Sequence, residues 1–292
     1  MSLALLCVVS AALSASPLLV ETDDLAGIAS ALVVDVRDAD AFAAGHIPGA
    51  AHLDYEQLSE NRDGVNGLLK PMDALIPILA DAGLDPERTI VVYGAMDGAT
   101  SVVPATRVFW VLEYLGYRDV RLLNGGLAKW RAEERPLETG ASQASPIVPE
   151  RLSTLAPREA LYATREEVLD AQRTKQGLLV DLRGKSDFTG ETKSGSAPKA
   201  GHITGAKNLP GSEFLEEPYF TFKAPEQIRA LVAAASPEAN QPVITYCNTG
   251  RIATVGYVAY RIAGFEDVSL YDGSMSEWGL HAECPMSTGP QS

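Results

Sequence analysis

Short apolar runs alternate with longer helical patterns along this chain. The runs that predict strands lie at residues 32–36, 90–93, 120–123, 178–182, 243–246 and 268–271. Apolar side chains recur with helical periodicity at residues 105–115 and 253–263. Short buried strands separated by helices are typical of a parallel sheet that is covered on both faces. We therefore predict an α/β fold of mostly parallel sheets with helices on both faces.

The same pattern occurs twice because the sequence itself repeats. The segment LVVDVRDADAFAAGHIPGA in the first half is matched by LLVDLRGKSDFTG and AGHITGA in the second half. Within these segments, Asp35-x-Arg37 is matched by Asp181-x-Arg183. A repeat of this length indicates duplicated domains rather than solenoid units. The total length of 292 residues is sufficient for two domains.

The expected domains cover residues 17–137 and 151–292, and the polar stretch 138–150 between them predicts a linker. Residues 1–16 are apolar and small, and they resemble a signal peptide whose apolar core is too short to span a bilayer. We therefore expect a periplasmic or secreted protein, with a cytoplasmic location as the alternative. The other interpretation of this segment is an apolar first helix, because no Lys or Arg precedes the run.

Composition and charge limit the partners of this protein. Hydrophobic residues make up 46% and charged residues 21%, as in ordinary globular proteins. The net charge of −14 argues against nucleic acid and anionic membranes as partners. An anionic substrate would need a local positive site, since the overall field repels it. The three cysteines form no visible disulfide framework, and one at a strand end is a candidate nucleophile.

Cys247 is that candidate because of the loop that follows it. A predicted buried strand ends at Cys247, and the residues before the next helix are Asn248, Thr249, Gly250, Arg251 and Ile252. Gly250 permits a positive φ, which lets consecutive amides point inward and bind an anion. Arg251 adds a positive charge and several donors. Such surroundings favour a thiolate and would stabilise a persulfide, whereas the plain alternative is a cysteine packed in the core.

Three further residues are candidates for support of this loop. Asp181 and Arg183 end a neighbouring strand, and their counterparts in the first copy favour a structural role. Arg183 could still reach the loop, because the carboxyl ends of parallel strands share one edge of the sheet. Asp272 follows the last predicted strand and is a candidate brace for the loop.

His46 and His202 lie in repeated Gly-His-Ile turns, so we expect both to be structural. No second histidine is close to either of them in sequence, and we expect no metal site. Walker-type and dinucleotide-binding fingerprints are absent from the sequence, and we expect no organic cofactor. Cys284 is expected to be a bystander, with resolution of a persulfide as its alternative role.

These motifs together resemble the two-domain rhodanese family, which includes thiosulfate and 3-mercaptopyruvate sulfurtransferases. The matching features are D-x-R near each domain start, GHIPGA and GHITGA, LLNGG-x-x-x-W, Y-D-G-S-x-x-x-W and the loop C-N-T-G-R. The resemblance extends from about residue 18 to residue 286. It implies two tandem rhodanese-like domains, an inactive first and an active second, with the active cleft between them.

The sequence of the first copy agrees with an inactive first domain. Gly94 stands where the second copy has Cys247, and the loop that follows Gly94 contains no thiol. The resemblance implies that the second domain moves a sulfane sulfur from thiosulfate to cyanide or a thiol through a Cys247 persulfide. The loop amides and Arg251 would hold the anionic donor.

Three other functions remain open. A 3-mercaptopyruvate sulfurtransferase is the nearest, although family members with that preference usually have a neutral Cys-Gly-Ser-Gly loop, and Arg251 suits thiosulfate better. A phosphatase of the related fold needs Cys-x5-Arg, whereas Ala253 replaces that arginine here. A non-catalytic rhodanese-like binding protein is the remote alternative. The expected partners are a small anionic sulfur donor and a thiol or cyanide acceptor, without nucleic acid or membrane, for a monomer or weak homo-oligomer.

Overall fold

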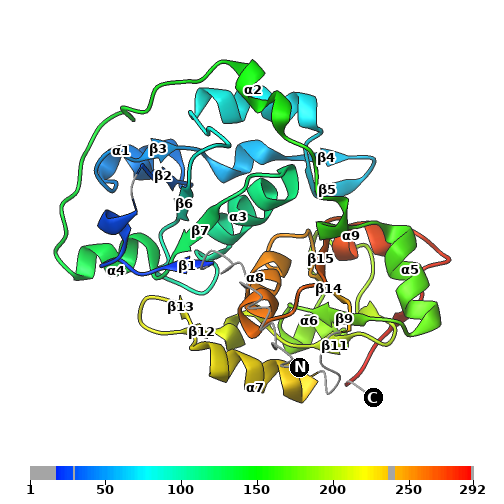
Figure 1. Cartoon of the computed structure of the whole chain (residues 1–292). Helices are drawn as coiled ribbons and strands as arrows, with labels where there is room; N and C mark the ends of the chain where they lie inside the picture. The colour runs from blue at the N-terminus through cyan, green and yellow to red at the C-terminus, as the bar shows by residue number, and fades with distance from the viewer. Residues whose placement is uncertain (1–17, 29, 236–240, 291–292) are drawn as a thin grey trace, which may run out of the picture.

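The computed structural model describes residues 18–28, 30–235 and 241–290, and it divides into two lobes (Figure 1). The predicted signal peptide at residues 1–16 lies outside the described residues. The first lobe contains the first sequence repeat and the second lobe contains the second repeat. None of the helices in the described ranges has the length and apolar character that crossing a membrane requires.

A five-stranded parallel sheet forms the centre of the first domain. Its strands, in spatial order, are β1 (Leu19–Val20), β7 (Val120–Leu123), β6 (Ile90–Tyr93), β2 (Leu32–Asp35) and β3 (Ala51–His52). Its helices are α1 (Ala39–Ala44), α2 (Met72–Asp81), α3 (Val103–Leu115) and α4 (Gly126–Ala132), with short 3₁₀ turns η1 (Leu25–Gly27) and η2 (Tyr55–Leu58). A hairpin of β4 (Ser59–Arg62) and β5 (Val65–Leu69) extends from this domain.

The second domain repeats the sheet with the same strand order. Its five parallel strands are β8 (Tyr162–Ala163), β15 (Val268–Tyr271), β14 (Val243–Tyr246), β9 (Leu178–Asp181) and β11 (Lys207–Asn208). Its helices are α5 (Arg165–Thr174), α6 (Lys185–Thr189), α7 (Pro225–Ala235), α8 (Ala253–Ala263) and α9 (Ser274–Trp278). Smaller elements are β10 (His202–Ile203) with β16 (Met286–Ser287), β12 (Leu215–Glu216) with β13 (Thr221–Phe222), and the turns η3 (Pro149–Thr154), η4 (Glu159–Leu161) and η5 (Gly211–Phe214).

The predicted fold class is confirmed, and the predicted strands agree with the observed ones to within one residue. The pattern missed the outer strands of each sheet, which are two residues long and therefore too short to carry a period. The inner strands of the two sheets, which are β7, β6 and β2 in the first and β9, β14 and β15 in the second, consist almost entirely of buried residues. Such burial on both faces explains why they are continuous apolar runs rather than alternating ones.

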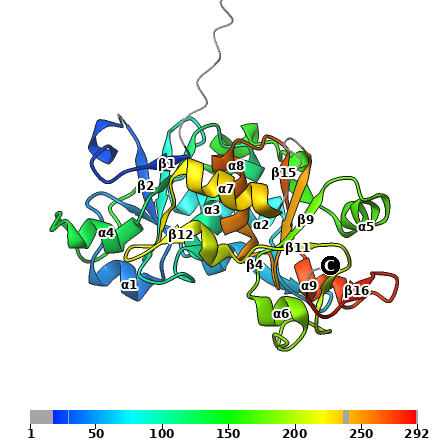
Figure 2. The same ribbon diagram turned by 90° about the horizontal axis from the view of Figure 1, so that it is seen from below.

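The two domains meet along α3 and α8, which lie side by side at the centre of the molecule (Figures 1 and 2). The hydroxyls of Thr106 and Thr254, which occupy equivalent places in the two copies, hydrogen-bond across this contact at 2.8 Å. Glu113 also accepts from the Tyr257 hydroxyl at 2.7 Å. These buried polar pairs fix the register of one domain against the other.

Between α4 and η3 the chain forms no helix or strand and runs along the outside of the first domain (Figure 1). Glu138 exchanges two backbone hydrogen bonds with His46, and the Ile147 amide donates to the Ala80 carbonyl. The segment 138–150, which we predicted to be a linker, is therefore attached to the first domain at several points.

Candidate active site

Cys247 lies directly after β14, a central strand of the second sheet. This places the thiol at the edge where the carboxyl ends of the parallel strands meet, the usual position of functional groups in such sheets. Its exposed fraction is 1%. So little access favours a reaction with a small molecule.

The hydroxyl of Ser274 holds the two ends of the Cys247 loop together. Its Oγ accepts from the Cys247 amide at 3.1 Å and from the Gly250 amide at 3.0 Å, and it donates to the Tyr271 carbonyl at 2.7 Å. The first amides of α9 complete the arrangement, because that of Met275 donates to the Cys247 carbonyl at 3.1 Å. The segment that follows β15 thus holds the Cys247 loop, which follows the neighbouring strand β14.

Gly250 is at φ +69°, and the place where a Cβ would stand is already occupied by Asp272. A Cβ at this position would lie 2.6 Å from the Asp272 carbonyl oxygen. Only glycine combines this backbone conformation with such a close approach. The positive φ that the loop pattern predicted for Gly250 is present, and a side chain at this position would collide with Asp272.

Four further amides of the loop have no acceptor within the described part of the chain. They belong to Asn248, Thr249, Arg251 and Ile252, all of which are partly exposed. Consecutive backbone donors of this kind suit an anion. These amides are the donors on which the predicted anion site depends.

Arg183 braces the loop from the neighbouring strand. It forms a bidentate pair with Asp181, at 2.9 and 2.6 Å, and donates to the Gly201 carbonyl. Its remaining nitrogen, Nη1, donates to the Asn248 side chain at 3.2 Å. Arg37 forms the equivalent bonds in the first domain, where Gly94 stands in place of the cysteine, so most of this arrangement maintains the fold.

A buried arginine from the first domain supports the loop from the other side. Arg107 on α3 and Asp272 are both 0% exposed, and they form an ion pair at 2.7 Å. Arg107 also donates to the Gly250 carbonyl at 3.3 Å and to the Gly67 carbonyl at 3.4 Å. Sequence reasoning missed this residue, although a charged residue in the centre of a largely apolar helix was an available signal.

The β4–β5 hairpin of the first domain packs directly on the loop. The Asn66 amide donates to Ser276 Oγ at 2.8 Å, and the Leu69 amide donates to Asp272 Oδ2 at 2.7 Å. A Cβ on Gly67 would lie 3.3 Å from Thr249 Cβ. Because both domains contribute to these contacts, the Cys247 loop lies at the boundary between them.

Arg251 binds a carboxylate of the first domain. Its two terminal nitrogens donate to Glu56 at 2.8 and 2.6 Å, and its guanidinium lies 5.4 Å from the centre of the Tyr55 ring. Burial raises the pKa of Tyr55 to about 12, so this phenol is uncharged at neutral pH. Partial burial opposes ionisation of Glu56, but hydrogen bonds from Arg251 outweigh it and lower the pKa of the carboxyl.

The histidines of the two Gly-His-Ile turns have matching structural contacts. His46 Nδ1 bonds the Phe42 carbonyl at 3.0 Å, and His202 Nδ1 bonds the Phe188 carbonyl at 2.7 Å. Each ring also stacks on the phenylalanine concerned. The side chain of Cys284 belongs to a different apolar cluster from Cys247, and burial raises the pKa of its thiol.

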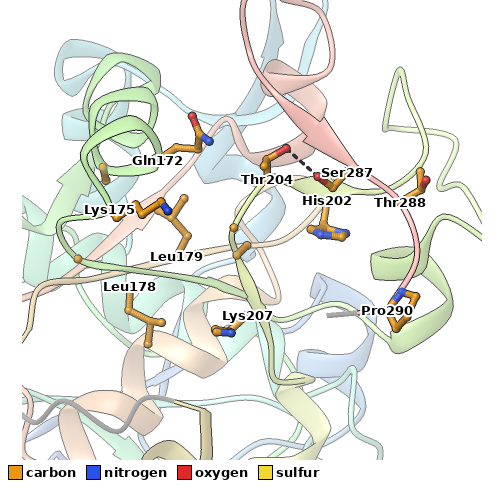
Figure 3. Close-up of a pocket in the computed structure, with 14 residues that line it drawn as sticks. Gln172, Lys175, Leu178, Leu179, His202, Thr204, Lys207, Ser287, Thr288 and Pro290 are labelled. Atoms are coloured by element: carbon orange, nitrogen blue, oxygen red, sulfur yellow. Dashed lines mark hydrogen bonds between the residues drawn. The ribbon is translucent and has the colours of Figure 1, made fainter. Parts of the chain in front are cut away.

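A separate pocket of about 560 Å³ lies on the second domain between α5, β9 and the C-terminal strand β16 (Figure 3). Thr204 and Ser287 hydrogen-bond at 2.8 Å within it. The pocket includes no residue of the Cys247 loop and no thiol, so its size does not make it the reaction site. Across the described residues, no group of three His, Cys, Asp or Glu side chains is arranged to hold a metal ion.

Comparison with known proteins identifies the family of this site. The model for the rhodanese-like domain matches residues 19–133 and again residues 164–281. The chain belongs to the rhodanese-like family. Its two copies of the domain make it a tandem rhodanese, and it is a sulfurtransferase, as the sequence motifs predicted.

Three relatives illustrate this similarity. The chain is 31% identical over 260 residues to the sulfur carrier protein TtuD of Thermus thermophilus, covering 85% of this chain and 87% of that protein. It is 32% identical to the thiosulfate sulfurtransferase of Rattus norvegicus, covering 80% and 77% of the two chains. The crystal structure of SseA from Escherichia coli, described among the 3-mercaptopyruvate sulfotransferases, has a TM-score of 0.76 at 25% identity, covering 89% of this chain and 99% of that one.

Proposed function

We propose that this tandem rhodanese moves the outer sulfur of thiosulfate to cyanide or a thiol through a persulfide on Cys247. The supporting observation is the Cys247 loop, which Ser274 closes and which leaves four successive or nearly successive amides without acceptors among the described residues. Such a ring of donors stabilises an anion on the thiol and on the leaving group. The non-catalytic binding protein is less well supported, since simple structural packing needs no such loop.

The first half-reaction forms the persulfide. The Cys247 thiolate attacks the sulfane sulfur, a new S–S bond forms, and sulfite departs with the electron pair of the old S–S bond. In the second half-reaction, cyanide attacks the terminal sulfur and leaves as thiocyanate, which regenerates the thiolate. Each step balances in charge without any metal or redox partner.

One observation favours 3-mercaptopyruvate as a second candidate donor. The positive charge of Arg251 is already matched by Glu56, so this guanidinium is not a free cation. Donors of lower charge suit such a surface better than a dianion does. Steady-state rates with the two donors, measured on one preparation, decide between them.

Mass spectrometry after thiosulfate treatment tests the proposed intermediate. We expect the wild-type chain to gain about 32 Da, the mass of one sulfur, on the peptide that contains Cys247. Cys247→Ala should remove both the added mass and the transfer activity. Cys284→Ala is the matched control and should retain both; transfer that survives in Cys247→Ala contradicts the proposal.

A further inference from the structure

We propose that Glu56 of the first domain sets the donor selectivity of the second by competing with the anionic donor for Arg251. This inference rests on the proposed use of thiosulfate. It assigns a specificity-determining role to a residue outside the catalytic domain. Neither the cysteine loop nor the motifs around it contain this carboxylate.

The argument begins with the geometry of the guanidinium. Both terminal nitrogens of Arg251 donate to the two oxygens of Glu56, at 2.8 and 2.6 Å. The third nitrogen, Nε, faces the hairpin, because a Cβ on Gly67 would lie 3.7 Å from it. A sulfonate and a carboxylate bind the same planar fork. An incoming thiosulfate oxygen can therefore use this fork only after Glu56 leaves it.

The energy of the pair suits competition rather than permanent blockage. The side chains of Arg251 and Glu56 are 29% and 51% exposed. Pairs of this exposure are worth about 0.2–1 kcal/mol. A dianion that meets Arg251 can displace the carboxylate, but its binding is weakened by the cost of breaking the pair.

Tyr55 keeps the guanidinium in place while the carboxylate exchanges. Its ring lies against Arg251, and its raised pKa keeps it neutral, so it adds no competing charge. When the two copies are aligned on Thr106 and Thr254, Val103 of the first copy stands at the position of Arg251. The first copy therefore has no counterpart of the Arg251–Glu56 pair at its own loop.

The test measures thiosulfate binding by calorimetry in a Cys247→Ala background, where no sulfur transfer follows. We expect Glu56→Gln to lower the dissociation constant for thiosulfate by about 1.4- to fivefold, the range that corresponds to an exposed ion pair. Glu60→Gln is the matched control, since Glu60 pairs with Arg62 of the same strand, β4, and not with Arg251. In an Arg251→Met background, Glu56→Gln should have no effect.

The same substitutions with Cys247 intact test selectivity. Glu56→Gln should raise kcat/KM for thiosulfate more than for 3-mercaptopyruvate, because the Coulomb energy scales with donor charge. The inference is overturned if Glu56→Gln leaves thiosulfate binding unchanged, if Glu60→Gln has the same effect, or if the effect persists without Arg251. Absence of a Cys247 persulfide in the wild type would instead refute the proposed function, whatever the binding results show.

Discussion

Replacement of Arg107 by methionine should strongly destabilise this protein, although Arg107 lies in the first domain and not in the domain that contains Cys247. The substitution keeps an unbranched apolar side chain and removes the guanidinium group with its charge. It leaves Asp272, which is 0% exposed, with one remaining donor, the Leu69 amide at 2.7 Å. A buried carboxylate that loses its partner costs about 3–5 kcal/mol. For chains of this size, that corresponds to a fall in Tm of roughly 6–20 °C.

Differential scanning calorimetry measures this change directly. Arg118→Met is the control, because Arg118 forms an ion pair with Glu87 whose side chains are 76% and 54% exposed. That pair should contribute less than about 1 kcal/mol. The double variant Arg107→Met/Asp272→Asn removes the unpaired charge and should recover a large part of the loss, since an amide still accepts from the Leu69 amide.

The buried pair also positions the reaction loop through the Gly250 carbonyl. We therefore expect Arg107→Met to slow persulfide formation at temperatures where the variant remains folded. Equal Tm losses for Arg107→Met and Arg118→Met would refute the reasoning, because Asp272 would then have to be satisfied in some other way. No recovery in the double variant would contradict the charge argument specifically.

Three further predictions follow from the site. Ser274→Ala leaves the buried amides of Cys247 and Gly250 without their acceptor, at a cost of about 1–3 kcal/mol for each amide. The variant should therefore have both a lower urea midpoint and a slower rate of persulfide formation. If neither quantity changes, Ser274 does not support the site. Gly250→Ala should abolish transfer, because its Cβ would lie 2.6 Å from a backbone oxygen of Asp272, and a fully active variant, assayed with both donors, would contradict the loop geometry. Hydrogen bonds from Arg251 lower the pKa of Glu56, because they outweigh the opposing effect of partial burial. The stability that the ionised Glu56 adds is therefore present above its unfolded pKa of about 4.5, and it is lost as the pH falls through the lower folded pKa. The difference between wild type and Glu56→Gln in thiosulfate KM should accordingly stay constant from about pH 6 to pH 9, and a change within that interval would show that another group titrates there.

Cleavage of residues 1–16 can be tested independently of the active site. Residues 1–16 are proposed to be a signal peptide, so the mature protein should begin near residue 17. Intact-mass measurement of the protein purified from its natural host gives this boundary. An uncleaved chain would favour the alternative interpretation of an apolar first helix.

Much of the fold was predictable because it depends on local patterns. The apolar runs at β6 and β14 and the periodic helices α3 and α8 are visible in short windows of sequence, and the repeat shows that the two sheets are equivalent. The two-residue outer strands were not predictable, since they acquire their conformation only by pairing with an inner strand.

Cys247 and its loop were predictable for the same reason. A strand, a turn with Gly250 and a helix follow one another within a dozen residues, so the sequence alone indicates where a thiol meets a group of amides. Asp181 and Arg183 also lie close together in sequence, and their pairing repeats that of the first copy.

The partners that complete the site come from distant parts of the chain, and only the tertiary structure determines them. Arg107 and Gly250 are separated by 143 residues, Glu56 and Arg251 by 195, and Leu69 and Asp272 by 203. No local pattern encodes such pairs, because they depend on how two equivalent domains pack along α3 and α8. The sequence by itself determined which thiol is the candidate nucleophile, whereas domain packing decided which charged side chains surround its loop.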